Sequence, residues 1–272
     1  MNFGEIFGKS WKEYWGNFSQ FFKFMALFLG IPTLVLTSIS IMYSFLNPEV
    51  WSVVSNPALA EQLNPLDLLS TLSPYIALSI AIGLISFFLT IYVGKGIISL
   101  GLKGDKYKYH SLVSAGKERY WRFAGFAIVS TIFILLLSLL LFIPGIIFGI
   151  FWIFGAYIFV SQNKGIIGSL KASFHMVRGR WWQTFGYLIL IVLVCAAAAI
   201  IVSIIDIPLA FTSSFYSALN GGEISKPFFV ISALLRWLIN FLANLFTIPF
   251  TIIFFKNYYL SVIGKSKKKR TN

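Results

Sequence analysis

The side chains best placed to do chemistry lie along one apolar run near the C-terminal end of the chain. Asn240, Asn244, Thr247 and Thr251 follow one another at spacings of 4, 3 and 4 residues, which puts them on one face of a helix. An asparagine that faces lipid is costly, so this polar stripe is expected to face another helix or a watery path. Hydrogen bonding between helices is our first interpretation, and a path for a solute or a proton is the alternative.

Two charged residues, Asp206 and Arg236, lie at the end of one apolar run and at the beginning of the next. Both are expected near the same membrane interface, where an ion pair between the two runs is geometrically feasible. A structural pin between helices is the first interpretation. A gate or an anchor for a solute is the alternative.

The sequence shows no signature of an enzyme or a metal site. The two histidines, His110 and His175, accompany no HExxH motif, and Cys195 is the single cysteine. No apolar run carries paired carboxylates, and neither a nucleophile elbow nor a phosphate-binding glycine loop occurs. We therefore expect a protein that is not an enzyme and that uses no metal and no cofactor.

The composition indicates the environment in which these polar residues act. Of the 272 residues, 58% are hydrophobic and only 11% are charged, and the mean hydropathy is +0.82. Soluble domains carry about 25% charged residues. The chain is therefore predicted to be an all-α integral membrane protein, and its net charge of +13 is read as a topology signal and not as a sign of nucleic-acid binding.

Six apolar runs are long enough to cross a bilayer, because about 20 helical residues span its hydrocarbon core. They cover residues 21–46, 74–99, 122–142, 145–162, 183–206 and 236–256. Their length and lack of alternation exclude a barrel. A tight turn at Ile143, Pro144 and Gly145 is predicted to join the third and fourth runs into a hairpin. Small residues such as Gly83, Gly145 and Gly149 predict close packing between helices.

Positive charge is confined to one side of this arrangement. In a six-span topology, 20 of the 22 lysines and arginines fall on the side of the termini, and the other two are Lys226 and Arg236. Both termini are therefore expected in the cytoplasm. Arg236 and Lys256 bracket the last span and are expected to reach the two interfaces by snorkelling. The basic tail, residues 257–272, is expected to contact anionic lipid headgroups through Lys267, Lys268, Lys269 and Arg270.

One charged, aromatic passage occurs twice at a constant offset of 163 residues, as SWKEYWGNFSQFFK (10–23) and SFHMVRGRWWQTFG (173–186). Apolar residues recur every three or four positions in and before both copies, which predicts amphipathic surface helices over residues 1–20 and 164–181. The apolar stripes are Phe3, Phe7, Trp11, Tyr14 and Phe18 in the first copy, and Ile166, Leu170, Phe174, Val177 and Trp181 in the second.

These surface helices are expected to lie on the cytoplasmic membrane surface, with Lys9, Lys12, Arg178 and Arg180 directed to water or to lipid phosphates. Gly16 and Gly179 are expected at the bend where each surface helix turns into a span, because glycine tolerates the conformations that end helices.

A weaker third copy precedes the third span. RYWRFAGF (119–126) matches RWWQTFGY (180–187), and KGII occurs at both 95–98 and 164–167. Residues 105–121 are accordingly predicted to form a third surface helix. The chain then consists of three pseudo-repeats, each a surface helix followed by a membrane hairpin.

Two segments are expected on the opposite, outer side, at residues 47–73 and 207–235. In the first, Asn-Pro recurs at Asn47, Asn56 and Asn64, a pattern that starts helices. Its apolar side chains predict a lid folded over the outer face, and a docking surface is the alternative.

The run IPGIIFGIFW (143–152), followed by KGIIGSLKASFHMVRGRWWQTFG (164–186), resembles a broad prokaryotic family related to the membrane domain of glycerophosphoryl diester phosphodiesterases. The resemblance covers most of the chain in layout and residues 143–187 in motif. It implies a six-helix bundle with surface helices in the cell membrane of a prokaryote, and no agreed molecular activity. The sequence shows no appended soluble catalytic domain, so phosphodiesterase activity is not expected.

Together these features predict a non-enzymatic, multi-pass membrane protein that engages lipids, mainly anionic ones, as a scaffold or accessory protein. A protein partner is left open. The alternative is a small transporter or lipid-translocating protein that uses the polar stripe of the last span.

Overall fold

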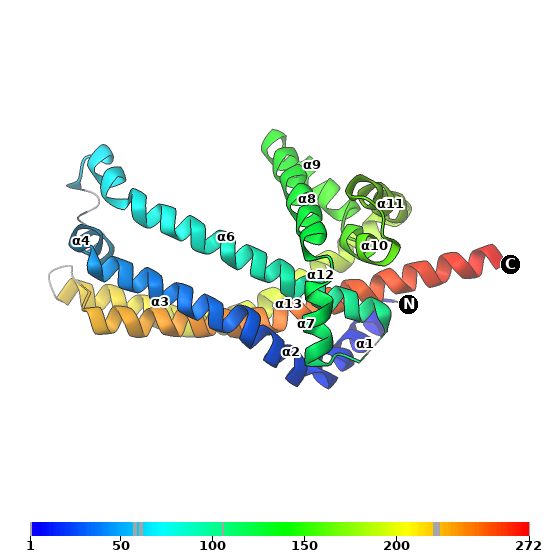
Figure 1. Ribbon diagram of the computed structural model, residues 1–272, viewed down its shortest axis with the longest axis horizontal. Coiled ribbons are helices and arrows are strands. Elements are labelled where there is room, and N and C mark those ends of the chain that lie inside the picture. The colour runs from blue at the N-terminus through cyan, green and yellow to red at the C-terminus, as the bar shows by residue number, and fades with distance from the viewer. Residues whose placement is uncertain (1, 57–58, 60–61, 105, 220–223, 272) are drawn as a thin grey trace. The chain divides into compact units, whose positions relative to one another are not determined.

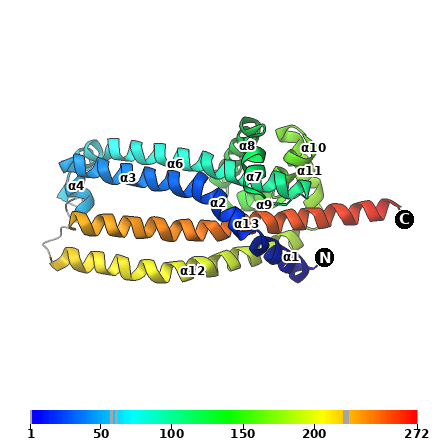
Figure 2. The ribbon, with the colours of Figure 1, turned by 60° about the horizontal axis from the view of Figure 1, so that its bottom comes forward.

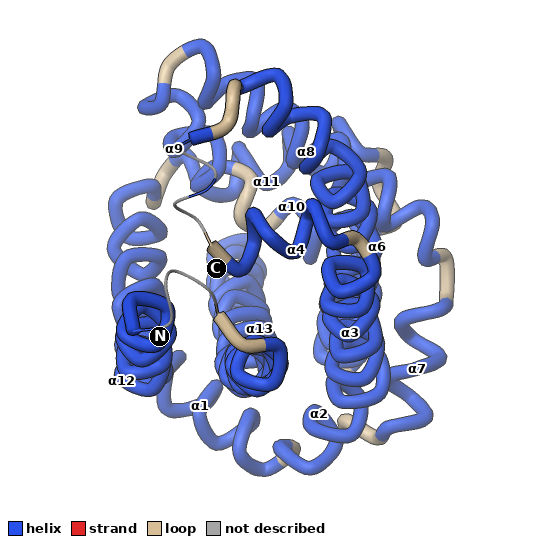
Figure 3. The backbone as a smooth tube through the Cα atoms, turned by 90° about the vertical axis from the view of Figure 1, so that its left-hand side faces the viewer, coloured by secondary structure: helices blue, strands red, loops and turns tan. Residues whose placement is uncertain are grey.

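The computed structural model of the protein describes residues 2–56, 59, 62–104, 106–219 and 224–271, which form helices and short connections with no strand among them (Figure 1, Figure 3). In chain order the helices are α1 (Phe3–Gly16), α2 (Phe18–Met25), α3 (Ile31–Leu46), α4 (Pro48–Ser55), α6 (Pro65–Lys103), α7 (Tyr109–Lys117), α8 (Tyr120–Leu140), α9 (Phe142–Phe151), α10 (Gly155–Gln162), α11 (Ile166–Arg178), α12 (Trp181–Leu219) and α13 (Lys226–Thr271). A π-helical turn, Ala26–Gly30, joins α2 to α3.

Six helical stretches of the described chain are long and apolar enough to cross a membrane. They are Phe18–Leu46, Pro65–Lys103, Tyr120–Leu140, Phe142–Gln162, Trp181–Ala198 and Lys226–Gly264. Each overlaps one of the six predicted runs, so the all-α fold class is confirmed. Helices suit hydrocarbon because every backbone polar group is satisfied inside its own segment. The six apolar helices indicate a multi-pass membrane protein.

The helices extend beyond the predicted runs on the side assigned to the outer segments. Helix α6 begins at Pro65 and carries Pro74 in its interior, and α12 continues through Pro208 to Leu219. Residues 65–73 of the predicted lid, and residues 207–219 and 226–235 of the predicted outer segment, therefore continue the helices of the spans. The predicted Asn-Pro helix starts are confirmed at Pro48 and Pro65, whereas Pro74 and Pro208 lie inside helices.

The chain divides into two compact units. One, which we call the basic unit, contains Met1–Met25, Thr90–Ala196 and Leu245–Asn272, and the other, the lid unit, contains Ala26–Leu89 and Ala197–Asn244. By residue number, 20 of the 22 lysines and arginines belong to the basic unit. The charge asymmetry that the sequence predicts thus coincides with the division into units.

In the lid unit, α3 lies beside the part of α13 that belongs to this unit (Figure 2). The indole Nε1 of Trp237 donates a hydrogen bond to Thr33 Oγ1 over 3.0 Å. Helix α4 covers the end of α3: the Trp51 ring contacts the rings of Phe45 and Phe229, while Val50 is buried. The stretch 57–63, which was predicted as a further short helix, lies largely outside the described residues.

In the basic unit, α8 and α9 form the predicted hairpin (Figure 1). The turn is made at Leu141, two residues before the predicted Ile143–Gly145, and α9 has already begun at Phe142. Gly145 is required here, because a Cβ on it would lie 1.9 Å from Ser138 Oγ. Gly83 and Gly149 have open space around them, so the close packing predicted at those two positions was wrong.

Helix α1 packs on α13 within the basic unit. It begins with a capping box, in which Asn2 Oδ1 accepts from Glu5 N and Glu5 Oε2 accepts from Asn2 N. The rings of Phe3 and Phe7 contact those of Phe254 and Phe250. Part of the apolar stripe predicted to face lipid is therefore covered by protein.

The fully buried residues of α1 are Ile6, Ser10 and Tyr14, of which Tyr14 belongs to the predicted stripe, while Trp11 of the stripe is exposed. Ser10 can be buried because its hydroxyl donates to the Ile6 carbonyl over 2.8 Å. The apolar stripe therefore did not include Ser10, because its residue type gives no sign of burial.

Burial follows the predicted duplication closely. At offsets of 102 and 163 residues, equivalent positions are buried in all three copies. These sets are Ser10, Leu112 and Ser173; Tyr14, Gly116 and Val177; Phe21, Phe123 and Thr184; and Phe24, Phe126 and Tyr187. The break between surface helix and span also recurs, at Asn17, Arg119 and the pair Gly179–Arg180. This pattern supports three repeated units.

Two details of the repeat were wrong. Gly179 has φ −83° and Gly16 is not among the positive-φ residues, so glycine's conformational freedom is not what makes the bends; the left-handed residue is Arg119, at φ 50°. The two KGII copies are not equivalent either. Residues 95–98 are buried within α6, whereas Lys164 and Gly165 are exposed before α11.

Candidate anion-binding pocket

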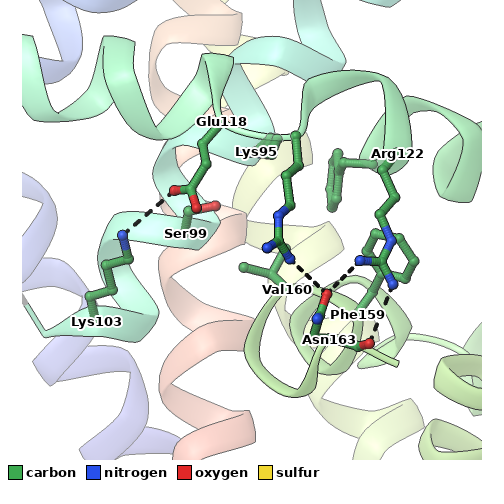
Figure 4. A pocket seen from close by; sticks show the side chains of 10 residues that line it. Lys95, Ser99, Lys103, Glu118, Arg122, Phe159, Val160 and Asn163 are labelled. Carbon is green, nitrogen blue, oxygen red and sulfur yellow. Dashed lines mark hydrogen bonds and ion pairs between the residues drawn. The ribbon is translucent and has the colours of Figure 1, made fainter. Parts of the chain in front are cut away.

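A small cavity of the basic unit lies where the ends of three apolar helices meet (Figure 4). Its volume is about 110 Å³, and we call it the arginine pocket. Helix α6, the connection from α7 to α8, and the end of α10 all contribute to its wall. The lining residues are Lys95, Ser99, Lys103, Glu118, Arg119, Arg122, Phe123, Phe159, Val160 and Asn163.

Lys95 forms the inner end of the pocket. Its side chain is buried, 5% exposed, and its ammonium group donates to the Ala115 carbonyl at the end of α7. Helices α6 and α7 approach closely at this point, because Cβ atoms on Gly96 and Gly116 would lie 2.9 Å from Leu112 O and 2.8 Å from the Tyr92 ring. The two glycines thus let one helix bring a lysine to the end of the other.

Arg119 and Arg122 converge on one neutral side chain, Asn163. Arg119 Nη1 donates to Asn163 Oδ1 over 3.0 Å, and Arg122 Nη1 donates to the same oxygen over 2.5 Å. Arg122 Nη2 also donates to the Asn163 carbonyl over 3.3 Å, and its guanidinium lies 5.4 Å from the centroid of the Phe159 ring. Figure 4 shows Arg122 directed to Asn163. Two positive groups are therefore held together without a carboxylate between them.

The backbone is strained at both partners of this contact. Arg119 and Asn163 each have φ 50°, and within the described ranges they are the non-glycine residues in the left-handed region. Asparagine tolerates that region, whereas for arginine it costs about 1–2 kcal/mol. Strain of this kind concentrates at functional sites, where the surrounding structure has to maintain it.

Charge in the arginine pocket is strongly unbalanced. Four lining residues are basic, and Glu118 is the acidic one. Glu118 lies 3.7 Å from Lys103, in a pair whose side chains are both more than half exposed, so the pair is weak. The two arginines have no carboxylate partner in the described part of the chain. An excess of three positive charges faces the cavity.

Backbone groups add to this field. Helix α8 begins at Tyr120 and has no side-chain cap at its N-terminus. The first amides of such a helix have no acceptor in the helix, and the helix dipole makes this end partly positive. An anion in the pocket can therefore meet guanidinium groups and helix-end amides together, which is the donor set that binds phosphate in many proteins.

A second polar cluster joins α1 to α13 and was missed by the sequence analysis. Lys256 was predicted to snorkel to an interface; instead its side chain is 6% exposed and pairs with Glu13 Oε1. Glu13 Oε1 also accepts from Tyr107 Oη over 2.9 Å, and Glu13 Oε2 accepts from Asn257 Nδ2 over 3.0 Å. No local signal predicts this pairing, because 243 residues separate the two charges.

Burial changes the acidity of two tyrosines around this cluster. Burial raises the pKa of Tyr14 to about 12, and its hydroxyl donates to the Leu245 carbonyl over 3.2 Å. Burial, together with the nearby Glu13 carboxylate, raises the pKa of Tyr107 far above its usual range. Both phenols are thus held neutral as hydrogen-bond donors that fasten neighbouring segments.

The polar stripe lies along α13 and is shared between the two units. Asn240 is exposed, and its amide donates to the Arg236 carbonyl of its own helix over 2.8 Å. Asn244 is also exposed, and both asparagines belong to the lid unit. Thr247 and Thr251 belong to the basic unit, where Thr251 Oγ1 lies 3.5 Å from Cys195 Sγ. The interhelical hydrogen bond predicted for Asn240 is therefore replaced by a bond within its helix.

The remaining predicted site residues differ in their exposure. Arg236 is exposed on α13, and the side chain of Asp206 lies outside the described part, as do those of Lys267, Lys268, Lys269 and Arg270. Lys9, Lys12 and Arg178 are exposed and Arg180 is partly exposed, as headgroup contacts require. His110 and His175 are exposed too, and the described residues hold no cluster of three metal-binding side chains.

The arginine pocket was missed although its residues carry part of a signal. RYWRF (119–123) was recognised as a repeat element, but its arginines were read as topology markers. The partner that gathers them, Asn163, is 41 and 44 residues away. Comparison with known proteins gives no match to a family model, a curated protein or a solved structure.

Proposed function

We propose that this multi-pass membrane protein binds the phosphate group of an anionic lipid in the arginine pocket, and that it acts as a non-enzymatic lipid-binding scaffold or accessory protein. The observation that carries the proposal is the convergence of Arg119 and Arg122 on the neutral Asn163. Each guanidinium keeps donors that match a phosphate oxygen, and no carboxylate within the described ranges competes for them.

The location of the pocket favours a lipid over a soluble anion. Lys103 is the last residue of one apolar helix, Tyr120 is the first residue of the next, and Asn163 directly follows a third. A ligand in the pocket lies level with the ends of these helices, which is the depth of headgroups in a bilayer. Trp121, beside the pocket, is 77% exposed, as is usual for tryptophan at a membrane interface.

The remaining expectations belong to the same proposal. The concentration of lysine and arginine in the basic unit supports a cytoplasmic location for this unit and for both termini. The resemblance of residues 143–187 to the prokaryotic six-span family supports a location in the cell membrane of a prokaryote. Neither consideration identifies a protein partner, which we leave open.

Transport is the competing function. It would use the polar stripe, of which Thr251 meets Cys195 whereas Asn240 and Asn244 are exposed. Cysteines substituted at Asn244 and Thr247 separate the two functions, because a transport path makes both reactive toward a water-soluble thiol reagent. A scaffold leaves both unreactive in the bilayer.

Lipid binding to the arginine pocket is measured in nanodiscs that contain phosphatidylcholine with or without phosphatidylglycerol. We expect phosphatidylglycerol to raise the melting temperature of the wild-type protein and to raise that of Arg122→Gln much less. Lys23→Gln, which removes an exposed lysine elsewhere in the basic unit, serves as the matched control. Equal shifts for all three proteins would refute the proposal. Stabilisation by inorganic phosphate alone would identify a soluble anion as the ligand.

A further inference from the structure

We infer that the protein carries a second lipid site, at which one glycerophospholipid lies with its phosphate at Arg178 and Arg180 and an acyl chain against Ile147 and Phe151. This site, which we call the tryptophan groove, lies in the basic unit between α9 and the junction of α11 with α12, and Trp181 and Trp182 complete its wall. It is separate from the arginine pocket and does not rest on the function proposed for that pocket.

The internal duplication makes the tryptophan groove the counterpart of the arginine pocket. At an offset of 61 residues, Arg180 corresponds to Arg119 and Trp182 to Trp121. Both tryptophans are 77% exposed. Each junction thus places an arginine directly before a span and an exposed tryptophan two residues later. A tryptophan held outward at the start of an apolar helix suits the headgroup region of a bilayer.

The two sites differ in what surrounds the arginines. The arginine pocket is small, and both of its arginines donate to Asn163 in its wall. The tryptophan groove measures about 620 Å³ and continues from its arginines onto Ile147 and Phe151 of α9. A site of several hundred Å³ with apolar walls and a few polar groups is typical of small-molecule binding. The groove therefore has room for hydrocarbon as well as for a headgroup.

The polar end of the groove complements a phosphodiester. Among its lining residues, Arg178 and Arg180 are the charged ones. Helix α12 begins at Trp181, so its first amides lie beside these arginines. The indole Nε1 of Trp181 is buried and has no acceptor among the described residues. The two guanidinium groups and the helix-end amides together match the oxygens of a phosphodiester.

The occupant that fits these features is a membrane phospholipid. A free phosphate would use the arginines and leave the apolar wall exposed, and a fatty acid would lack the phosphodiester that two arginines bind best. Arg178 is exposed and Arg180 is partly exposed, so a lipid can reach both from the bilayer without unfolding the site.

Photochemical labelling tests this inference in the intact protein. The probe is a phosphatidylcholine whose acyl chain carries a photoreactive group, diluted into phosphatidylcholine vesicles that contain the protein. We expect label on the peptides 142–151 and 181–183, and about a tenfold loss of label in Arg178→Gln/Arg180→Gln, since hydrogen bonds to charged groups are lost. Trp182→Ala should also lose label. Its matched control is Trp121→Ala, which has the same exposure and should keep it.

Label that is spread evenly over the apolar helices and unchanged in the double variant would overturn the inference. Binding of inorganic phosphate to the groove without any label from the acyl probe would overturn its acyl part, because a free anion would then occupy the site. Circular dichroism and melting temperature show whether the variants fold. The test of the arginine pocket, in which phosphatidylglycerol raises the melting temperature, does not depend on the outcome of this labelling experiment.

Discussion

Arg119 and Asn163 are hydrogen-bonded to each other, and both have a left-handed backbone. The first ends the connection into α8 and the second ends α10, so two strained positions from different parts of the chain hold one contact. The same asparagine oxygen accepts from Arg122. A neutral amide that holds two guanidinium groups leaves both available for an anion, which is the basis of the predictions below.

Because the backbone of Arg119 is strained, we expect substitutions at this position to weaken lipid binding without lowering the stability of the protein. Arg119→Gly removes the charge and also relieves a left-handed residue, a gain of about 1 kcal/mol that offsets the lost hydrogen bond. We expect an unchanged or higher melting temperature and a clear loss of stabilisation by phosphatidylglycerol. Asparagine tolerates the same backbone region, so we expect Arg119→Asn to have the same effects as Arg119→Gly. A large fall in melting temperature with both variants would show that the arginine side chain is structural.

The pair formed by Glu13 and Lys256 predicts a strong dependence of stability on each partner. Glu13→Gln leaves a buried lysine without its carboxylate, which we expect to cost about 3 kcal/mol of unfolding free energy. The double variant Glu13→Gln/Lys256→Met removes both charges and should recover most of the loss. Chemical unfolding in detergent measures both. If the single variant were as stable as the wild type, the pair would be weak and solvated.

The two buried phenols predict instability at alkaline pH. In the unfolded chain, tyrosine ionises at a pKa of about 10, whereas the folded protein holds Tyr14 neutral up to about 12 and Tyr107 beyond that. The stability contributed by these raised pKa values is complete below about pH 10 and is lost as the pH rises through the folded values. Tyr107→Phe should flatten this decline, as measured by unfolding between neutral and strongly alkaline pH. An identical decline in the variant would exclude Tyr107 as a cause.

The hairpin of α8 and α9 offers a matched pair of glycines. Gly145→Ala places a methyl group 1.9 Å from Ser138 Oγ and 2.9 Å from Ser138 Cα, and the backbone atom cannot be moved by a rotamer change. We expect a loss of about 1–3 kcal/mol. Gly149→Ala meets open space in the same helix and should be neutral or slightly stabilising. Thermal unfolding that ranks the two variants in the opposite order would contradict the helix approach described here.

The sequence predicts the spans well because hydrophobic length is a local property. All six runs are recovered as helices, and the Asn-Pro pairs at Asn47 and Asn64 mark the starts of α4 and α6, whereas α12 continues well beyond the predicted end at residue 206. The duplication was also visible in the sequence. Its buried positions were not, since Ser10 and Ser173 turn inward and satisfy their hydroxyls on nearby carbonyls.

The site could not be predicted in the same way. Arg119 and Arg122 look like ordinary positive charges at a span until the fold brings Asn163 to them. Lys256 looks like an interfacial lysine until Glu13 is placed beside it. Contacts between distant segments decide whether a charge is a topology marker, a structural pair or a ligand-binding group, and a periodicity of three or four residues carries no information about them.

Asn163→Asp tests the central claim most directly. The change keeps the size and the left-handed tolerance of the side chain but gives the two arginines a carboxylate, so the pocket becomes its own anion site. We expect equal or slightly higher thermal stability, by up to about 1 kcal/mol for such an exposed pair, and affinity for phosphatidylglycerol reduced about tenfold when measured by native mass spectrometry or by lipid titration in nanodiscs. Undiminished affinity for the anionic lipid in a folded Asn163→Asp protein would contradict the assignment of the arginine pocket.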